Sequence, residues 1–370
     1  MNKHAKNELV FLMGLGALAA LFLKQKKVSA GLGIGAAALA LSQIKKPESF
    51  RGKVVVVTGG SRGLGLAIAQ RFAIEGARIV LIAREFKELE RAKHSLEMHV
   101  PADQILIAPC DITDDEELSS TFVTTIRKWG QIDVLVNNAG AIIVGPFESM
   151  SMEDFEAQMK LHLYANIRAT QKVLPHFRRN GGGRIINICS MGGKVAVPHM
   201  LPYDTSKFAL AGFSQGITAE LSKENISVTT VYPTLLRTGS PIQAVFKGDA
   251  KKEFSWFANA DVMPGLSLDP SVAAEKIVEA SRERRSELIP SFIGRLRMVV
   301  GTVLPELMLV TMGIVNQLMP KGKNKTYKTG AQCLTDDTYL TKGLKQASRH
   351  AEESWNQKQK GDPEFNLGLH

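Results

Sequence analysis

The sequence has few cysteines, three in 370 residues, at Cys110, Cys189 and Cys333. They lie far apart and form neither a C-x-x-C pair nor a metal-ligand spacing with the eight histidines. We therefore expect reduced thiols in a reducing compartment, with no disulfide framework and no metal site. Aromatic residues make up only 6% of the chain, but hydrophobic residues reach 44%, which excludes a disordered chain.

Acidic residues are too few to balance the 46 Lys and Arg, so the formal net charge is +10. The excess lies in the flanks: residues 1–53 hold 9 basic and 2 acidic residues, residues 321–370 hold 9 and 6, and residues 54–320 hold 28 of each. A nucleic-acid-binding domain carries its basic stripe on the folded body, so we expect no nucleic-acid partner. The basic flanks favour contact with membrane lipid instead.

No uncharged apolar run reaches the roughly 20 residues that a membrane-spanning helix needs. Residues 9–23 and 28–44 are apolar, and lysines flank both runs. Lysines follow the first run where a cleaved signal peptide has small residues, which disfavours a signal peptide. We predict that residues 1–50 anchor the protein to a membrane, as a spanning helix or a tight hairpin. The alternative is a helix buried against the body.

Residues 51–290 alternate short β-rich runs with helical periodicity. Strands are expected at 54–57, 78–82, 105–108, 133–137, 184–188 and 226–231, and helices near 63–76, 86–98, 114–129, 151–178, 203–223 and 269–285. This alternation predicts an α/β fold of the Rossmann type, a doubly wound parallel sheet in a single catalytic domain. Ligands of such sheets bind at the carboxyl ends of the strands.

Two further segments follow the predicted domain. Residues 291–320 are apolar but contain Arg295, Arg297, Pro305 and Glu306, which favours an amphipathic segment that lies in a membrane interface or covers the substrate cleft. A core helix is the alternative. Residues 321–370 are polar with few apolar anchors, and we expect a loosely ordered tail.

A glycine-rich loop follows the first predicted strand and opens a helix. It reads TGGSRGLG over residues 58–65, and its candidate cofactor-binding residues are Gly59, Ser61, Arg62, Gly63, Leu64 and Gly65. Glycines permit a tight turn and let backbone N–H groups approach a pyrophosphate, to which the helix N-terminus adds its positive dipole end. The loop between strand and helix therefore predicts a dinucleotide site.

The choice between NAD and NADP depends on the charge near the ribose 2′ position. Ala83 stands at the end of the second strand, where an acidic residue would favour NAD, and Arg84 follows it. Arg62 lies inside the loop itself. Because guanidinium groups bind phosphate bidentately, the two arginines favour NADP(H) over NAD(H). The alternative is that each arginine is a solvated surface residue.

Three residues with a characteristic spacing predict the chemistry. Ser190 precedes Tyr203 by thirteen residues, and Lys207 follows Tyr203 by four. Tyr and Lys at i and i+4 share one helix face, and a nearby cation lowers the pKa of a phenol, which favours general acid work. Ser190, at the end of the preceding strand, donates to a substrate oxygen that gains negative charge.

With the glycine loop, these residues resemble the short-chain dehydrogenase/reductase family over about residues 52–290. The resemblance implies that Tyr203 protonates a carbonyl oxygen and that Lys207 also binds the nicotinamide ribose. Asp111 would contact the adenine, and the Asn137–Gly140 stretch (Asn138, Ala139, Gly140) would brace the sheet against the cofactor.

Two positions depart from the family's pattern. His162 stands where an Asn usually supports a water and proton relay; because a histidine titrates near pH 6.5, the relay would differ, and simple packing of His162 is the alternative. After Pro233 the usual Gly is Thr234, which restricts the backbone beside the nicotinamide, while Thr238 stands where a Thr often contacts the carboxamide.

The predicted substrate side is hydrophobic. Residues 239–268 follow the sixth strand and contain Phe246, Phe254, Trp256, Phe257 and Met263, which would line a pocket or, alternatively, pack against the body. We predict a membrane-associated NADP(H)-dependent oxidoreductase, its domain on the cytoplasmic face, that interconverts a carbonyl and an alcohol on a lipid, steroid or retinoid-like substrate. The alternatives are a dinucleotide-binding regulatory protein and a soluble family member acting on a small polar carbonyl. Homodimer and homotetramer both stay open.

Overall fold

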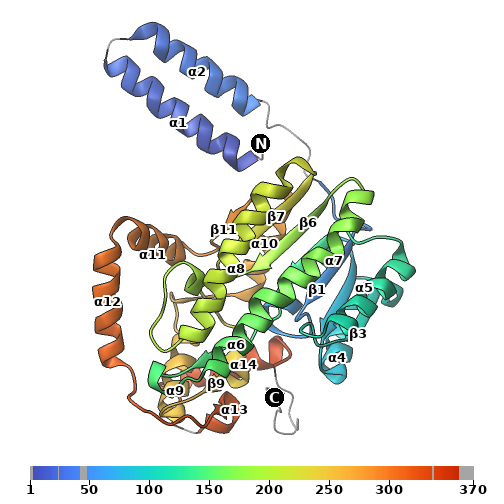
Figure 1. The fold of residues 1–370 in the computed structure, drawn as a ribbon, viewed down its shortest axis with the longest axis vertical. Helices are drawn as coiled ribbons and strands as arrows, with labels where there is room; N and C mark the ends of the chain where they lie inside the picture. The colour runs from blue at the N-terminus through green and yellow to red at the C-terminus, as the bar shows by residue number, and fades with distance from the viewer. Residues whose placement is uncertain (1–2, 24, 42–47, 336, 358–370) are drawn as a thin grey trace.

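The computed structural model describes residues 3–23, 25–41, 48–335 and 337–357. Within these residues, the centre is a seven-stranded sheet whose neighbouring strands all run parallel (Figure 1). In spatial order its strands are β11 (Glu287–Leu288), β7 (Ile226–Val231), β6 (Gly183–Ile188), β4 (Val134–Asn137), β1 (Val54–Thr58), β2 (Arg78–Ala83) and β3 (Ile105–Pro109). The predicted doubly wound parallel sheet is confirmed.

Helices cover both faces of this sheet, which is why its strands are almost wholly apolar. Every residue of β1, which reads VVVVT, is buried, and β-branched side chains suit such a pleated interior. The first face carries α3 (Gly63–Ile74), α4 (Phe86–Leu96) and α10 (Pro270–Arg282). The second carries α5 (Asp115–Trp129), α7 (Ala165–Arg179) and part of α8 (Leu201–Glu220).

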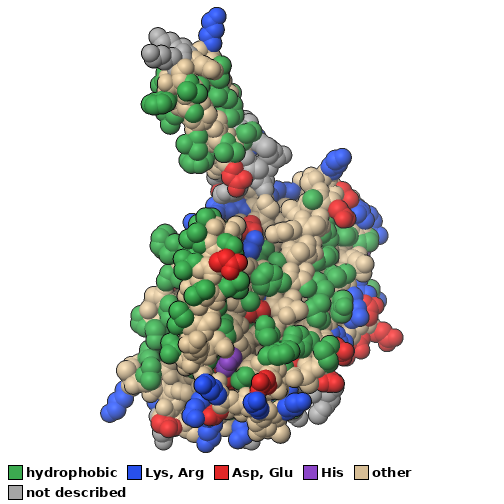
Figure 2. Space-filling view, turned by 60° about the vertical axis from the view of Figure 1, so that its left-hand side comes forward, with side chains coloured by type: hydrophobic (Ala, Val, Ile, Leu, Met, Phe, Trp, Pro, Cys, Tyr) green, Lys and Arg blue, Asp and Glu red, His purple; other side chains and the backbone are tan. Residues whose placement is uncertain are grey.

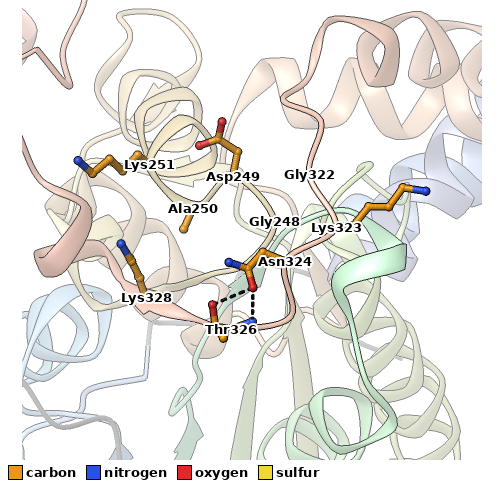
Figure 3. A pocket seen from close by; sticks show the side chains of 9 residues that line it. All are labelled: Gly248, Asp249, Ala250, Lys251, Gly322, Lys323, Asn324, Thr326 and Lys328. Atoms are coloured by element: carbon orange, nitrogen blue, oxygen red, sulfur yellow. Dashed lines mark hydrogen bonds between the residues drawn. The ribbon is translucent and has the colours of Figure 1, made fainter.

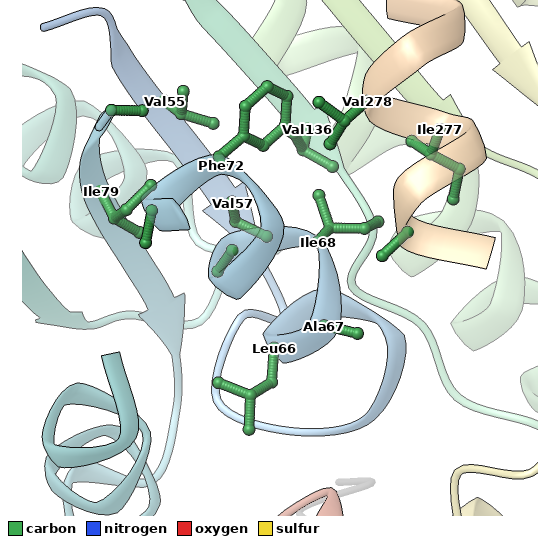
Figure 4. Close-up of a cluster of buried hydrophobic side chains, with 14 of the residues drawn as sticks. Val55, Val57, Leu66, Ala67, Ile68, Phe72, Ile79, Val136, Ile277 and Val278 are labelled. Atoms are coloured by element: carbon green, nitrogen blue, oxygen red, sulfur yellow. The ribbon is translucent and has the colours of Figure 1, made fainter. Parts of the chain in front are cut away.

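Figure 4 shows the core under the first face. Val55 and Val57 of β1 point toward Ile68 and Phe72 of α3, and Ile277 of α10 closes the cluster. This packing fixes the start of α3 above the carboxyl end of β1. The glycine loop is therefore held at the edge where ligands of parallel sheets bind.

The helix predicted over residues 151–178 contains a wider turn. It begins as α6 (Met152–Met159), passes through a π turn over Lys160–Tyr164 and continues as α7. Such π turns often mark functional sites. Here the turn contains His162.

A smaller layer covers the end of the domain where the substrate is expected. It contains β5 (Ile143–Val144), β9 (Val245–Phe246) and β12 (Lys328–Thr329) in one sheet and β8 (Leu235–Leu236) with β10 (Ser267–Leu268) in another. Its helices are α9 (Ala250–Val262), α13 (Gly330–Cys333) and α14 (Lys342–Ser354).

The structure differs from the predicted loosely ordered tail. Residues 321–357 supply β12, α13 and α14, and Cys333 and Tyr339 are buried against Phe246 and its neighbours. The sequence did not predict this ordered structure, because its few apolar side chains are scattered in a segment that is polar on average. Residues 358–370 of the predicted tail lie outside the described residues.

The N-terminal runs form two helices, α1 (Lys3–Phe22) and α2 (Lys26–Leu41), which pack side by side and project from the body (Figure 1). Gly16 approaches Leu32 and Gly35 approaches Met13, so small residues permit the close contact. The two apolar runs therefore form a helical hairpin. Among the described residues, however, no single helix is long and apolar enough to cross a membrane.

Past the sheet lie α11 (Phe292–Val303) and α12 (Pro305–Leu318), which meet at an angle of 118°. As a bent pair they have the length and composition of a span. No residue of α12 is buried, and Gly294 is the buried residue of α11. The alternative of a core helix for residues 291–320 is therefore wrong.

Candidate active site

Ser190, Tyr203 and Lys207 come together as predicted from their spacing. Ser190 follows β6, and its Oγ accepts a hydrogen bond from Gly192 N at 3.0 Å. Tyr203 and Lys207 stand one turn apart on α8, with Lys207 Nζ 5.5 Å from the centre of the Tyr203 ring. Lys207 Nζ also donates to Ile188 O at 3.0 Å. The end of β6 thus holds both the serine and the lysine ammonium.

Burial, rather than the nearby lysine, dominates the electrostatics of this cluster. Burial raises the pKa of Tyr203, while a hydrogen bond with Ser190 acts in the opposite direction. Burial lowers the pKa of Lys207 to about 8. We expected Lys207 to lower the pKa of the phenol. In the protein without ligand, desolvation outweighs that effect, because burial disfavours the charged forms of both groups.

His162 lies beside Tyr203, but its ring is already engaged. The two rings meet edge to face with centroids 5.4 Å apart. The Ser206 hydroxyl donates its proton to Tyr203 O at 2.7 Å. His162 Nδ1 lies 2.7 Å from Ser206 Oγ and therefore donates to it. Its Nε2 accepts from Ala141 N at 3.3 Å. Both bonds fit one neutral tautomer.

The surroundings of His162 disfavour the expected titration near pH 6.5. Burial and the neighbouring Lys207 hold its pKa well below the ordinary value, because an added charge there would lack water and face another cation. The lowered pKa therefore favours the neutral imidazole. Its backbone oxygen, meanwhile, accepts from Asn166 Nδ2 at 2.7 Å.

Asp204 was not predicted and lies next to Tyr203 in the sequence. Its Oδ2 accepts from Val197 N at 2.6 Å, and its Oδ1 is buried without a hydrogen-bond partner. Burial raises its pKa to about 7, and the charge of Arg297 on α11 opposes that effect. Arg297 Nη2 also donates to Val195 O at 3.2 Å. In the sequence, only the position of Asp204 next to Tyr203 could have pointed to it. Nothing in the sequence pointed to its contact with Arg297.

The glycine loop is tied to the end of β4. Thr58 Oγ1 accepts from the backbone N–H groups of Asn138 and Ala139 at 2.9 and 3.1 Å, and Asn138 Nδ2 donates to Thr58 O and Gly59 O at 3.0 Å each. Gly59 has a φ of +62°, and a Cβ on Gly65 would lie 2.1 Å from Gly59 O. The loop therefore requires glycine at both positions.

The loop arginine has an acidic partner that the sequence did not reveal. Arg62 Nη1 pairs with Glu88 Oε1 at 2.8 Å, and Ser61 Oγ donates to Glu88 Oε2 at 2.9 Å. Arg84 is exposed but close enough to Arg62 to lower the pKa of that guanidinium, an effect smaller than those of burial and Glu88. The two arginines thus share one region at the carboxyl ends of β1 and β2.

The C-terminal segment reaches the same loop. Gly63 N, the first amide of α3, donates to Trp355 O at 2.9 Å, and Asn356 Nδ2 donates to Ser61 O at 2.7 Å. Nothing in the local sequence pointed to these contacts, since residues 61 and 356 are 295 positions apart.

The remaining predicted cofactor residues are spread along the same edge. Asp111 follows β3, two strands from β1, and its Oδ1 accepts from Thr113 N at 2.8 Å. Gly140 lies against the His162 ring, Pro233 O accepts from Met191 N at 2.9 Å, and Thr238 is buried. Thr234, the departure from the family pattern, donates to Ser291 Oγ at 3.2 Å and so anchors the start of α11.

These features fit a dinucleotide. The loop offers a glycine cradle at the N-terminus of a twelve-residue helix, and Lys207 supplies a buried ammonium at the far end of the same edge. Leu64 and Gly65 lie in the first turn of that helix. Among the described residues, no group of three His, Cys, Asp or Glu side chains is placed to hold a metal ion.

The aromatic residues expected to line the substrate pocket form a core instead. Phe246, Phe254 and Phe257 are buried against one another, and Trp256 packs on their cluster. The packing alternative therefore holds for these residues. A hollow of about 400 Å³ lies elsewhere in this layer, between Gly248 and Thr326, with Lys251, Lys323 and Lys328 around it (Figure 3). None of the predicted catalytic residues lines it.

Comparisons with known proteins agree with this fold. A family model described as short chain dehydrogenase matches residues 53–245. A fatty acyl-CoA reductase of Acinetobacter baylyi is 34% identical over 74% of this chain and 87% of its own. A 3-dehydrosphinganine reductase of Danio rerio is 33% identical over 51% of this chain and 58% of its own. The crystal structure of L-sorbose reductase from Gluconobacter frateurii, complexed with NADPH and L-sorbose, superposes with a TM-score of 0.57 at 28% identity, covering 66% of this chain and 97% of that one.

Proposed function

Because this chain belongs to the short-chain dehydrogenase/reductase family and is an NAD(P)-dependent oxidoreductase, we propose that it reduces the carbonyl group of a lipid-like substrate with NADPH. The observation that carries the proposal is the joining of Ser190, Tyr203 and Lys207 at the end of β6. The names of two relatives, a fatty acyl-CoA reductase and a 3-dehydrosphinganine reductase, support a lipid-like substrate.

The protein's part in the reaction is to hold and move one proton. When bound, the reduced nicotinamide supplies the hydride. Tyr203 donates its hydroxyl proton to the carbonyl oxygen, and its raised pKa keeps that proton in place at neutral pH. Ser190 donates a hydrogen bond to the same oxygen as its negative charge grows. Lys207 sits behind the Tyr203 ring, and its ammonium stabilises the phenolate that remains.

His162 acts in this proposal as a positioning residue. Through Ser206 it fixes the backbone oxygen of Tyr203, and its ring packs against the phenol. Its neutral form is favoured, because burial holds its pKa well below the ordinary value. The proton relay proposed for the family's Asn is therefore not assigned to this side chain.

The preference for NADPH rests on the two arginines. Arg62 and Arg84 repel each other at the carboxyl ends of β1 and β2, and a 2′-phosphate placed between them would relieve that repulsion. The neighbour complexed with NADPH supports this assignment. Gly59, Gly63, Leu64 and Gly65 hold the pyrophosphate in this proposal, and Asp111 contacts the adenine.

The experiment that tests the function is a screen of long-chain aldehydes and ketones with NADPH and NADH in parallel, on the wild type and on Tyr203→Phe. We expect consumption of NADPH by the wild type and a loss of turnover of about a thousandfold in the variant, the usual scale for a general acid. NADPH should bind the variant as tightly as the wild type. If Tyr203→Phe retained its turnover, Tyr203 would not be the proton donor and the proposed mechanism would be rejected.

We also propose that α11 and α12 dock on a lipid bilayer. Their exposed side chains include Phe292 (79% exposed), Leu309 (66%) and Leu318 (78%), and Figure 2 shows hydrophobic side chains gathered on this side of the body, where these helices come forward. Exposed apolar surface of this extent is typical of an interaction site. Lys321, Lys323 and Lys325 follow directly and suit anionic headgroups.

A nitroxide label distinguishes this surface from the α1–α2 hairpin. The three native cysteines are buried, so Leu309→Cys supplies a selectively labelled site on α12. With vesicles containing anionic phospholipid, we expect this label to gain oxygen accessibility and lose accessibility to a water-soluble relaxant. The matched control is Val123→Cys on α5, which is similarly exposed in the wild type and should stay aqueous. An aqueous signal at position 309 would reject the docking surface.

A further inference from the structure

The last residues of α14 and those that follow it lie on the glycine loop. We call residues 352–357 the capping segment. Gly63 N donates to Trp355 O at 2.9 Å, and Gly63 is the first residue of α3. A carbonyl oxygen with a partial negative charge therefore occupies the positive end of this helix. That is the position in which a loop of this kind binds a phosphate oxygen.

Asn356 fastens the capping segment to the loop and to α4. Its Nδ2 donates to Ser61 O at 2.7 Å and to Glu88 O at 3.1 Å, and its Oδ1 accepts from Arg91 Nε at 2.8 Å. Its φ of +56° lies in the left-handed region, which Asn tolerates better than most residues. One side chain thus links the capping segment to the glycine loop and to α4.

Gln357 extends the contact toward the nicotinamide side. Its side chain is buried, and its Nε2 lies 3.1 Å from the point where a Cβ on Gly63 would stand. The Cβ of Thr238 lies 3.6 Å from that same point. Gln243 Nε2 donates to Gln357 O at 2.9 Å. The capping segment therefore fills the space between the glycine loop and the segment that begins at Thr238.

The chain approaches just as closely one residue further on. A Cβ on Gly239 would lie 2.7 Å from the backbone of Glu352. Both sides of the expected cofactor cleft are thus in contact with the capping segment. A dinucleotide that reached from Gly63 to Thr238 would overlap with Trp355 and Gln357, since two groups cannot fill one van der Waals space.

We propose that the capping segment is an intramolecular competitor of the dinucleotide, so that NADPH binds only when this segment leaves the loop. The proposal rests on the proposed cofactor site. Its first consequence is that the apparent dissociation constant of NADPH equals the intrinsic one divided by the fraction of molecules with an open loop. Its second is reciprocal: NADPH must displace the capping segment, and anything that holds the segment elsewhere must tighten NADPH binding.

The test is a titration of the full-length protein with NADPH, followed by the fluorescence of the nicotinamide. Asn356→Ala removes three side-chain hydrogen bonds and places a less tolerant residue at positive φ, so the capping segment should be released. We expect the dissociation constant for NADPH to fall about tenfold. Gln346→Ala is the matched control, since Gln346 is exposed on α14, the helix that leads into the capping segment, and its constant should equal that of the wild type.

A second variant releases the capping segment without touching its hydrogen bonds. Ala351 is buried on α14, and Ala351→Glu would place a carboxylate in that buried position, which disfavours docking of the helix. It should tighten NADPH binding in the same direction as Asn356→Ala. Melting curves of each variant identify any that fails to fold.

The outcomes separate this proposal from the one on which it rests. Tighter binding in both release variants supports competition. Unchanged constants would overturn it, and weaker binding would make the capping segment part of the cofactor site instead. If neither the wild type nor any variant bound NADPH, the cofactor proposal itself would fall.

Discussion

The catalytic residues and the glycine loop lie at two ends of the same sheet edge, and they differ in how far along the chain their contacts reach. At the catalytic end, Ser190, Tyr203 and Lys207 come from one strand end and the helix that follows, and Lys207 is bonded to Ile188, only 19 positions away. At the dinucleotide end, the glycine loop is bonded to Asn356, 295 positions away. The catalytic end is thus built from local structure, whereas the dinucleotide end is covered by a remote segment, which in our proposal leaves when NADPH binds.

The largest effect should follow from a change in the glycine loop itself. A Cβ on Gly65 would lie 2.1 Å from Gly59 O and 2.5 Å from Asn138 Nδ2. Gly65→Ala should therefore lower the free energy of unfolding by about 3 kcal/mol, at the upper end of overpacking costs, and abolish NADPH binding. Chemical denaturation measures the first effect and titration the second.

Gly212→Ala on α8 is the control, because nothing stands within 4 Å of the added Cβ. It should raise the free energy of unfolding by about 1 kcal/mol through helix propensity alone. If the two variants were equally stable, the loop would accommodate a Cβ at position 65 despite its contacts with Asn138. A rigid loop could then no longer be contrasted with a removable capping segment.

Because Lys207 at the catalytic end is buried, the stability of the protein should depend on pH. Burial lowers the pKa of Lys207 from 10.5 to about 8, so the folded protein binds fewer protons than the unfolded chain between those values. Its charge destabilises the fold by about 3 kcal/mol below pH 8, and this penalty disappears as the pH rises toward 10.5. The wild type should therefore gain stability relative to Lys207→Met across this window.

Denaturant titrations at intervals from pH 7.5 to 10.5 measure that difference. A difference that stays constant with pH would mean that the Lys207 ammonium is not desolvated in the folded protein. The assembled, buried state of the catalytic end would then need revision.

The smallest effect should be on the choice of cofactor. Arg84→Ala removes the exposed one of the two guanidinium groups near the proposed 2′-phosphate, so the preference for NADPH over NADH should fall about tenfold, the scale of one charge-assisted contact. Lys87→Ala, an exposed change on the neighbouring helix, should leave the preference unchanged. Equal preferences in Arg84→Ala and the wild type would assign discrimination to Arg62 alone.

The same contrast explains what the sequence could reveal. The sheet, the glycine loop and the approach of Tyr203 to Lys207 were predictable because each is marked by a local pattern: alternating strands and helices, a glycine-rich turn, and an i, i+4 pair. The pairing of Arg62 with Glu88 and the cap of Asn356 on Ser61 depend on tertiary contacts that no local pattern encodes. Thr234 after Pro233 indicated an unusual loop, but the sequence did not reveal that Thr234 contacts Ser291.

Average composition also limited the predictions in two places. Their apolar character alone could not decide whether Phe246, Phe254 and Phe257 line a pocket or pack, and the small layer uses them as its core. Its partners, Cys333 and Tyr339, come from the polar segment expected to be loose. In both cases the segment average concealed single buried residues.

Hydrogen exchange of the full-length protein with and without NADPH tests the central claim most directly, because it reports on both ends at once. The account predicts that NADPH increases exchange in residues 352–357 and decreases it in residues 58–65 and 188–207. Decreased exchange in residues 352–357 would show that they close over the bound cofactor, and would contradict a cap that must leave.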